Sequence, residues 1–189
     1  MLLAGAALVA HGAAAQDSTR RFGHRAYREA PHTDLKSVGR YRATGRDVQL
    51  SLAAANAYEA MRVAALSDSV RLVPISGFRS VAYEQDLFAR AIRRHGSAER
   101  AARWVAPAGF SEHHTGYAID IGDQLAPACD TEVCFATTRA SVWLRNHAPR
   151  FGYELSFPEG HTDISYEPWH WRYIGDEASR KVFAASGAR

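Results

Sequence analysis

The chain has 189 residues, 47% of them hydrophobic and 23% charged, which suits one globular domain whose core needs no disulfide or metal to stabilise it. The net charge of +3 comes from arginines scattered along the chain rather than clustered on one predicted face. We therefore expect no nucleic-acid partner. Oligomeric state leaves no signal in the sequence, and we expect a monomer.

The N-terminus opens with a short apolar run that ends in Ala13, Ala14 and Ala15. This pattern is typical of a secretory signal, although its basic start is missing, and we expect cleavage after Ala15. The run is shorter than the ~20 residues of a membrane span, so an anchor is disfavoured. We expect no membrane span in the mature chain and a periplasmic or secreted location, with residues 16–46 forming a polar arm before the domain at 47–189.

The sequence contains two cysteines, Cys129 and Cys134. In an exported chain, two nearby cysteines predict a disulfide that closes a small loop. A zinc knuckle would need further Cys or His residues at the usual spacing, and none flank this pair. Two reduced thiols remain the alternative if the chain is not exported.

The elements are predicted in chain order from apolar periodicity and from capping and turn residues. Asp47 is expected to cap the first helix, and Ser80 and Gly96 to bound the second. Pro74 indicates an edge position or the end of its strand. The predicted helices span 48–66, 81–95, 98–105, 138–147 and 176–185, and the predicted strands span 70–75, 117–121, 151–155 and 169–174. Helices mostly precede strands, which indicates an α+β domain with a central antiparallel sheet flanked by helices.

Two separate segments carry residues suited to metal chemistry. His113 and Asp120 lie seven residues apart with Gly116 between them, so the chain can turn and bring both to one ion. His114 is an equally good ligand by its chemistry, and spacing does not decide between the two histidines. A hydrogen-bonded His–Asp pair without metal is the plain alternative.

The second segment contains Glu167 and His170, with Trp169 and Trp171 expected on the strand face opposite the histidine. Two His and one Asp can hold Zn²⁺ and leave its fourth position for water. A glutamate beside that water can accept and return a proton. A surface strand with a buried aromatic pair is the alternative interpretation.

Three sets of residues resemble the VanY-type D-alanyl-D-alanine carboxypeptidases, a zinc peptidase family of the M15 (LAS) group that also includes D-Ala-D-Ala dipeptidases and the hedgehog signalling domain. The first set is Ser111, His113, Gly116, Ala118 and Asp120; the second runs from Glu167 to Tyr173; the third is Ser76, Gly77, Phe78 and Arg79 with Gln85. Similar stretches begin at Trp143 and Phe151. The likeness spans roughly residues 48–175 and leaves out the arm and the cysteine loop.

This resemblance implies one Zn²⁺ ion held in a cleft by His113, Asp120 and His170, rather than by His114. It implies that Glu167 is the general base and later the acid, and that Arg79 stabilises the oxyanion. Ser111 and Gln85 are expected to bind the peptide terminus. Without the resemblance, Arg79 would be taken as a turn residue and Gln85 as a polar helix residue.

The function implied is hydrolysis of peptidoglycan stem peptides with release of terminal D-Ala. An L,D-carboxypeptidase and a cross-link endopeptidase would use the same residues and differ in pocket shape. A non-catalytic cell-wall binding module is an alternative from another class, because fold does not guarantee function. The presence of Glu167 together with all three ligand positions disfavours that module.

Overall fold

The computed structural model of the protein describes residues 19–184. The predicted signal segment at 1–15 lies outside the described residues. No helix within the described part combines the length and the apolar character that a membrane span needs.

A four-stranded antiparallel sheet forms the centre of the fold, with the strand order β5-β6-β8-β7. Its strands are β5 (Leu72–Ser76), β6 (Ala118–Asp123), β7 (Tyr153–Leu155) and β8 (His170–Tyr173). The predicted α+β class with an antiparallel sheet is thus confirmed. β5 is an edge strand, which is where Pro74 is tolerated because its missing N–H does not interrupt the sheet.

The N-terminal part differs from the prediction. The structure forms the short pair β1 (Arg20–Arg21) and β2 (His24–Arg25), and then a hairpin of β3 (Leu35–Arg40) with β4 (Asp47–Ser51). The expected helix start at 48–51 is therefore wrong: these residues are the strand β4, in which Val48 and Leu50 alternate inward. Ser51, not Asp47, is the N-cap residue of the helix that follows.

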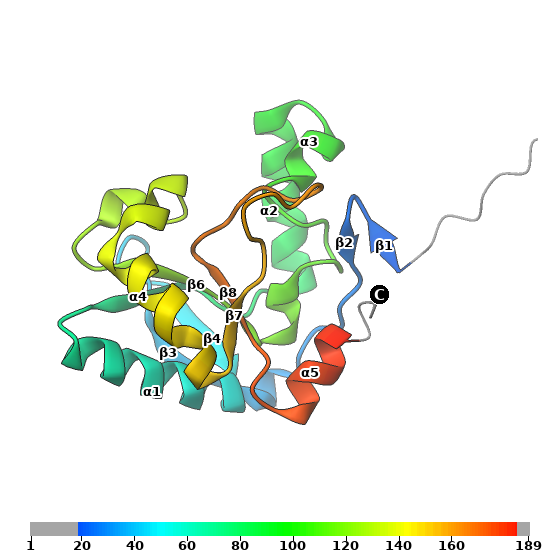
Figure 1. Cartoon of the computed structure of the whole chain (residues 1–189). Helices are drawn as coiled ribbons and strands as arrows, with labels where there is room; N and C mark the ends of the chain where they lie inside the picture. Colours follow the sequence, from blue (N-terminus) through cyan, green and yellow to red (C-terminus); the bar gives the residue numbers. More distant parts are fainter. Residues whose placement is uncertain (1–18, 185–189) are drawn as a thin grey trace, which may run out of the picture.

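Within residues 19–184, five α-helices surround the strands (Figure 1). α1 (Leu52–Ser67) and α4 (Arg139–His147) lie on one side, and α2 (Val81–His95) with the short α3 (Ala98–Ala102) lies on the other. α5 (Glu177–Ala184) closes the described chain. The predicted boundaries of α2 are confirmed: the Ser80 hydroxyl accepts the Tyr83 N–H, and Gly96 ends the helix with φ +84°. α3 is shorter than predicted.

The connections of this described part also contain five short 3₁₀ helices. They are η1 (His32–Asp34), η2 (Glu112–Thr115), η3 (Pro127–Cys129), η4 (Val133–Thr137) and η5 (Ala148–Phe151). Cys129 and Cys134 form the predicted disulfide, which joins η3 to η4.

Most buried apolar residues of the described chain fall into two clusters. The larger one joins α1, α4 and one face of the sheet, and it includes Tyr58, Ile119, Ile121 and Trp171. The smaller one joins α2 and α3 around Phe88. A cleft of about 570 Å³ is lined by residues of the sheet, of α2 and of the disulfide loop. The fold therefore leaves a hollow between its two packed parts.

Candidate metal centre and active-site cleft

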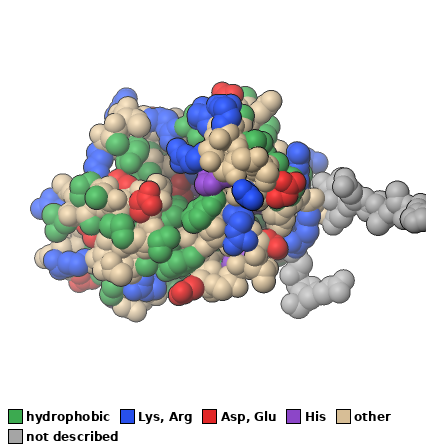
Figure 2. All heavy atoms as spheres, turned by 90° about the horizontal axis from the view of Figure 1, so that it is seen from above, with side chains coloured by type: hydrophobic (Ala, Val, Ile, Leu, Met, Phe, Trp, Pro, Cys, Tyr) green, Lys and Arg blue, Asp and Glu red, His purple; other side chains and the backbone are tan. Residues whose placement is uncertain are grey.

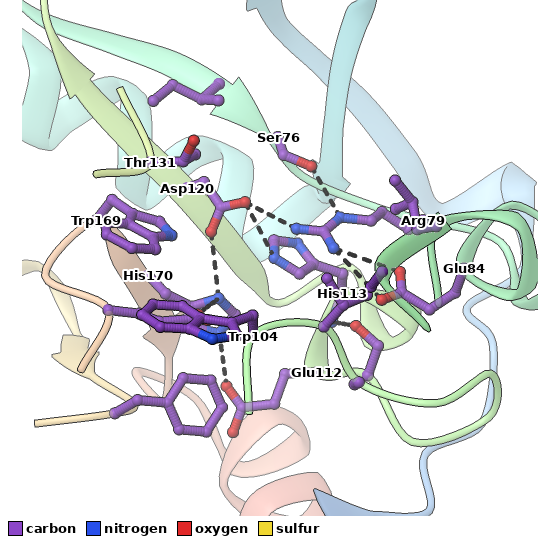
Figure 3. Close-up of a pocket in the computed structure, with 18 of the residues that line it drawn as sticks. Ser76, Arg79, Glu84, Trp104, Glu112, His113, Asp120, Thr131, Trp169 and His170 are labelled. Atoms are coloured by element: carbon purple, nitrogen blue, oxygen red, sulfur yellow. Dashed lines mark hydrogen bonds and ion pairs between the residues drawn. The ribbon is translucent and has the colours of Figure 1, made fainter. Parts of the chain in front are cut away.

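The register of the central sheet aligns residues that are far apart in the sequence across neighbouring strands. Asp120 on β6 pairs directly with His170 on β8 and with Ser76 on β5. Residues paired across antiparallel strands point to the same face with their Cβ atoms ~5 Å apart. Positions 76, 120 and 170 therefore line up across three strands, and all three residues line the cleft (Figure 3).

His113 reaches the same point from η2. Ser111 accepts the His113 N–H at the start of this turn, and Gly116 ends it with φ +70°. A Cβ on Gly116 would lie 3.1 Å from the backbone nitrogen of Ser51, so glycine suits both the turn and the close approach of β4. The sequence-predicted role of Gly116 in the turn is confirmed.

One ligand atom from each of His113, Asp120 and His170 lies within 4.8 Å of the others. The individual distances are 3.4 Å from His113 Nε2 to Asp120 Oδ2 and 3.2 Å from His170 Nδ1 to Asp120 Oδ1. Atoms bound tetrahedrally to zinc at 2.0–2.1 Å lie about 3.3 Å apart, so these spacings suit one ion. The three side chains are almost fully buried, at 2–4% exposure.

Hydrogen bonds fix which nitrogen of each histidine faces this point. His113 Nδ1 lies 2.7 Å from the carbonyl oxygen of Gly77, which can only accept, so Nδ1 carries the hydrogen and Nε2 presents a lone pair. His113 Nε2 and Asp120 Oδ1 are buried without a hydrogen-bond partner in the described part of the chain. Acceptors that face each other in this way fit a bound cation.

His114 is excluded as a ligand by its own contacts. Its Nδ1 donates to the Arg79 carbonyl at 2.7 Å, and its Nε2 accepts the Gly109 N–H at 3.0 Å. Both nitrogens are therefore used, and the ring positions the backbone of Arg79. This agrees with the implied choice of His113.

Glu112, which the sequence reasoning missed, orients His170. Its Oε2 accepts from His170 Nε2 at 3.0 Å and from the Ser156 hydroxyl at 2.6 Å, while Oε1 accepts from Arg172 at 2.8 Å. Burial raises the pKa of Glu112, but the hydrogen bond and charge of His170, together with Arg172, outweigh it and lower the pKa to about 2. The carboxylate therefore stays ionised and directs His170 Nδ1 toward Asp120.

The two histidines differ in protonation. Burial, followed by the charge of Arg79, lowers the pKa of His113 to about 4, so this ring is neutral at pH 7. Burial also disfavours charge on His170, but the carboxylates of Asp120 and Glu112 beside its two nitrogens raise its pKa to about 10. Without a metal, His170 therefore holds a proton that a metal would displace.

Glu167 lies at the turn before β8, with Oε2 3.7 Å from His170 Nδ1. It is 8% exposed, and burial raises its pKa to about 8 against the opposing charge of His170. A carboxyl group with a pKa near neutrality can both accept and return a proton. Trp169 also lines the cleft, so its expected position opposite His170 is wrong: β8 begins only at His170, and strand alternation does not extend back to position 169.

Arg79 points its guanidinium into the cleft (Figure 3). Nη2 donates to Asp120 Oδ2 at 2.8 Å, Nε donates to the Ser76 hydroxyl at 3.0 Å, and Nη1 lies 3.4 Å from Glu84. Burial opposes its charge, but Glu84 and Asp120 keep the pKa of Arg79 above its ordinary value. Arg79 is thus a fixed cation beside the predicted ligands.

Of the two residues expected to bind the substrate, Ser111 and Gln85, only Ser111 lines the cleft. Ser111 is buried and lines the cleft. Gln85 is exposed and does not line it, because one step along a helix turns the side chain by about 100°. Its neighbour Glu84, which is fully buried against Arg79, occupies the cleft wall instead.

The chain is thus an α+β domain that brings a buried His–Asp–His group to one cleft. The chain belongs to the VanY family: the family model, described as D-alanyl-D-alanine carboxypeptidase, matches residues 47–176. A D-alanyl-D-alanine carboxypeptidase of Enterococcus faecalis is 33% identical over 131 residues, 64% of this chain. The chain spans about half the length of this relative (46%) and of a Bacillus subtilis relative (48%).

Solved structures share the fold. The LdcB LD-carboxypeptidase has a TM-score of 0.69 and 27% identity, covering 85% of this chain and 75% of that chain. A VanY D,D-pentapeptidase variant solved in complex with Zn(II) has a TM-score of 0.60 and 24% identity, covering 83% of this chain and 88% of that chain. At 24% identity, the likeness to this second structure shows a shared fold and nothing further.

Proposed function

We propose that this chain is a zinc-dependent carboxypeptidase that removes terminal D-Ala from peptidoglycan stem peptides. The observation that carries the proposal is the buried convergence of His113 Nε2, Asp120 and His170 Nδ1 beside Glu167. Membership of the VanY family supports the peptide substrate.

His113, Asp120 and His170 would hold one Zn²⁺ ion. Two imidazoles and one carboxylate form a donor set that zinc accepts while keeping a fourth position open. When bound, zinc polarises the scissile carbonyl and lowers the pKa of a water molecule. Glu112 and the Gly77 carbonyl keep the two imidazoles aligned by taking their other N–H groups.

Glu167 takes the proton of the attacking water and returns it to the amine that leaves. Burial raises the pKa of Glu167 to about 8 in the metal-free protein, and a bound cation would lower it, so that the carboxylate can accept a proton near neutral pH. Arg79 donates hydrogen bonds to the oxygen that gains negative charge, from a guanidinium already held by Ser76 and Glu84. Ser111 would contact the peptide from the cleft wall. Gln85 has no part in this proposal.

Replacing Glu167 with Gln tests the proposal. We expect Glu167→Gln to bind zinc like the wild type and to lose at least roughly 10²-fold in turnover, because the proton acceptor is gone. Mass analysis of a stem pentapeptide after digestion measures the loss of one D-Ala. Glu159→Gln is the matched control, since Glu159 is an exposed carboxylate eight residues earlier that does not line the cleft. Full turnover by Glu167→Gln would contradict the assignment.

An L,D-carboxypeptidase is the second candidate, favoured by the likeness to LdcB. The two candidates differ in substrate rather than in machinery. Offering pentapeptide and tetrapeptide stems separately distinguishes them: loss of D-Ala from the pentapeptide alone supports the leading proposal, and loss from the tetrapeptide alone supports the second.

We also propose that the protein works outside the cytoplasm, as a monomer. The disulfide between Cys129 and Cys134 supports export, because disulfides persist in oxidising compartments. Cell fractionation with mass analysis of the mature N-terminus tests the location. Size-exclusion chromatography with light scattering tests the oligomeric state.

A further inference from the structure

The cleft continues past the metal centre along α2. Tyr83, Leu87, Arg90 and Arg94 recur at helical spacing and all line it, so one face of α2 forms the wall. At 1.5 Å per residue, Arg90 lies about 9 Å and Arg94 about 15 Å along the axis from Glu84, which contacts Arg79. The wall therefore extends well beyond the reacting bond.

This wall is cationic and uncompensated. Arg90 and Arg94 are exposed, and neither makes a hydrogen bond or ion pair with any residue of 19–184. A third arginine, Arg46, lines the cleft nearer to the metal end: it donates to the Tyr83 hydroxyl and stacks on that ring at 5.0 Å. Figure 2 shows Lys and Arg side chains gathered around a histidine on one face of the molecule. The two neighbouring positive charges of Arg90 and Arg94 attract an anion to their end of the cleft.

The opposite wall carries the reverse charge, because Glu132 of the disulfide loop faces the cleft. At the metal end the carboxylates are offset by Arg79, by Arg172 and by the ion that His113, Asp120 and His170 would hold. An anionic group on the acyl side of the substrate is therefore drawn to the arginines of α2 and away from Glu132.

Resting on the proposed function, we infer that Arg90 and Arg94 bind a free carboxylate of the substrate two to four residues before the scissile bond. An extended peptide advances about 3.4 Å per residue, so 9–15 Å corresponds to that separation. The terminal carboxylate cannot serve, because only one residue separates it from the bond cut. The preferred substrates are therefore acidic peptides, with the second carboxylate on the acyl side.

Two peptides of equal length test this inference: acetylated Ala-Glu-Lys-D-Ala-D-Ala and the same peptide with Gln in place of Glu. We expect the wild type to prefer the Glu peptide roughly fivefold in kcat/KM, mainly through KM, as exposed ion pairs allow. The double variant Arg90→Gln with Arg94→Gln should reduce this preference to below about twofold. Arg93→Gln, an exposed neighbour that does not line the cleft, should keep it.

The inference fails if the wild type treats both peptides alike, or if the double variant keeps the preference. It also fails if Arg93→Gln loses the preference equally. Cleavage of neither peptide by the zinc-loaded wild type would instead overturn the proposed function. In that case calorimetry with the two product tetrapeptides still tests the carboxylate site, because binding needs no turnover. If Arg90 and Arg94 form the site, the wild type binds the Glu product more tightly than the Gln product, and the double variant does not.

Discussion

At the residue scale, Glu112 connects the predicted metal ligands to the rest of the protein. It accepts from His170 and from Arg172, which lie two residues apart on β8 and so point to the same face. Without the charge of Glu112, His170 loses the group that fixes its orientation. Arg172 then keeps only Glu154 as a carboxylate partner in the described chain. Glu112 is therefore expected to set metal affinity without touching the metal.

We predict that Glu112→Gln weakens zinc binding by about 10–100-fold, the usual effect of losing a carboxylate that orients a histidine ligand. A competition titration against a zinc-binding dye measures this. Glu154→Gln is the control, because it removes the other partner of Arg172 but does not contact His170. Equal loss in both variants would mean that the Arg172 network, rather than the orientation of His170, controls affinity.

Side-chain chemistry made the centre of the site predictable. His113, Asp120, Glu167 and His170 are residue types whose combination indicates a metal site. Glu112 and Glu84 were not predicted, because a buried carboxylate and a solvated one look alike in a single sequence. The spacing of His170 and Arg172 on a predicted strand was the available signal for a carboxylate that bridges them.

At the element scale, the pairing of β6 with β8 brings Asp120 opposite His170, although fifty residues separate them in the chain. A register slip of one residue would turn one of them to the other face. η2 supplies the third ligand, and its end at Gly116 lies against β4, where the Ser51 N–H donates to the Gly116 carbonyl at 2.8 Å.

We predict that Gly116→Ala lowers the free energy of unfolding by about 2–3 kcal/mol, from a positive φ that alanine adopts at a cost and from crowding against Ser51 and Leu35. Urea denaturation of the metal-free protein measures it. Gly45→Ala is a matched control: Gly45 has φ +68° but no atom within 4 Å of a Cβ, so it should lose only about 1 kcal/mol. Equal losses would show that crowding at Gly116 is negligible.

Capped helices were predictable and short strands were not. Ser80 and Gly96 bound α2 in the sequence as they do in the structure, because capping is a local interaction. β4 was mistaken for the start of α1, since five residues of alternation run directly into a helical pattern. Its strand character comes from pairing with β3, a contact that no local pattern encodes.

At the scale of the whole molecule, the cleft lies where two apolar clusters meet. The sheet side presents the ligands, the turn between β5 and α2 presents Arg79, and α2 presents Arg90 and Arg94 along its length. The predicted metal ligands thus belong to the part of the molecule built on the sheet, and the cationic wall belongs to the part built on α2 and α3. The sequence did not reveal the wall, because the arginines look scattered until the helix is placed against the sheet.

Zinc binding is linked to protons across this centre. With pKa values raised to about 10 and about 8, His170 and Glu167 are mostly protonated at pH 7 in the metal-free protein, whereas His113 is neutral. A cation displaces the proton of His170 and lowers the pKa of Glu167, so binding should release roughly one to two protons. Because protons leave, zinc affinity should rise as pH increases from 6 toward 8.

The most direct measurement is a calorimetric zinc titration of the metal-free protein in buffers of different ionisation enthalpy, with His113→Ala beside the wild type. We predict one ion per chain, proton release at pH 7, and loss of binding at this site in the variant. A wild type that binds no zinc, or a folded His113→Ala variant that binds it with unchanged affinity and proton release, would contradict this prediction.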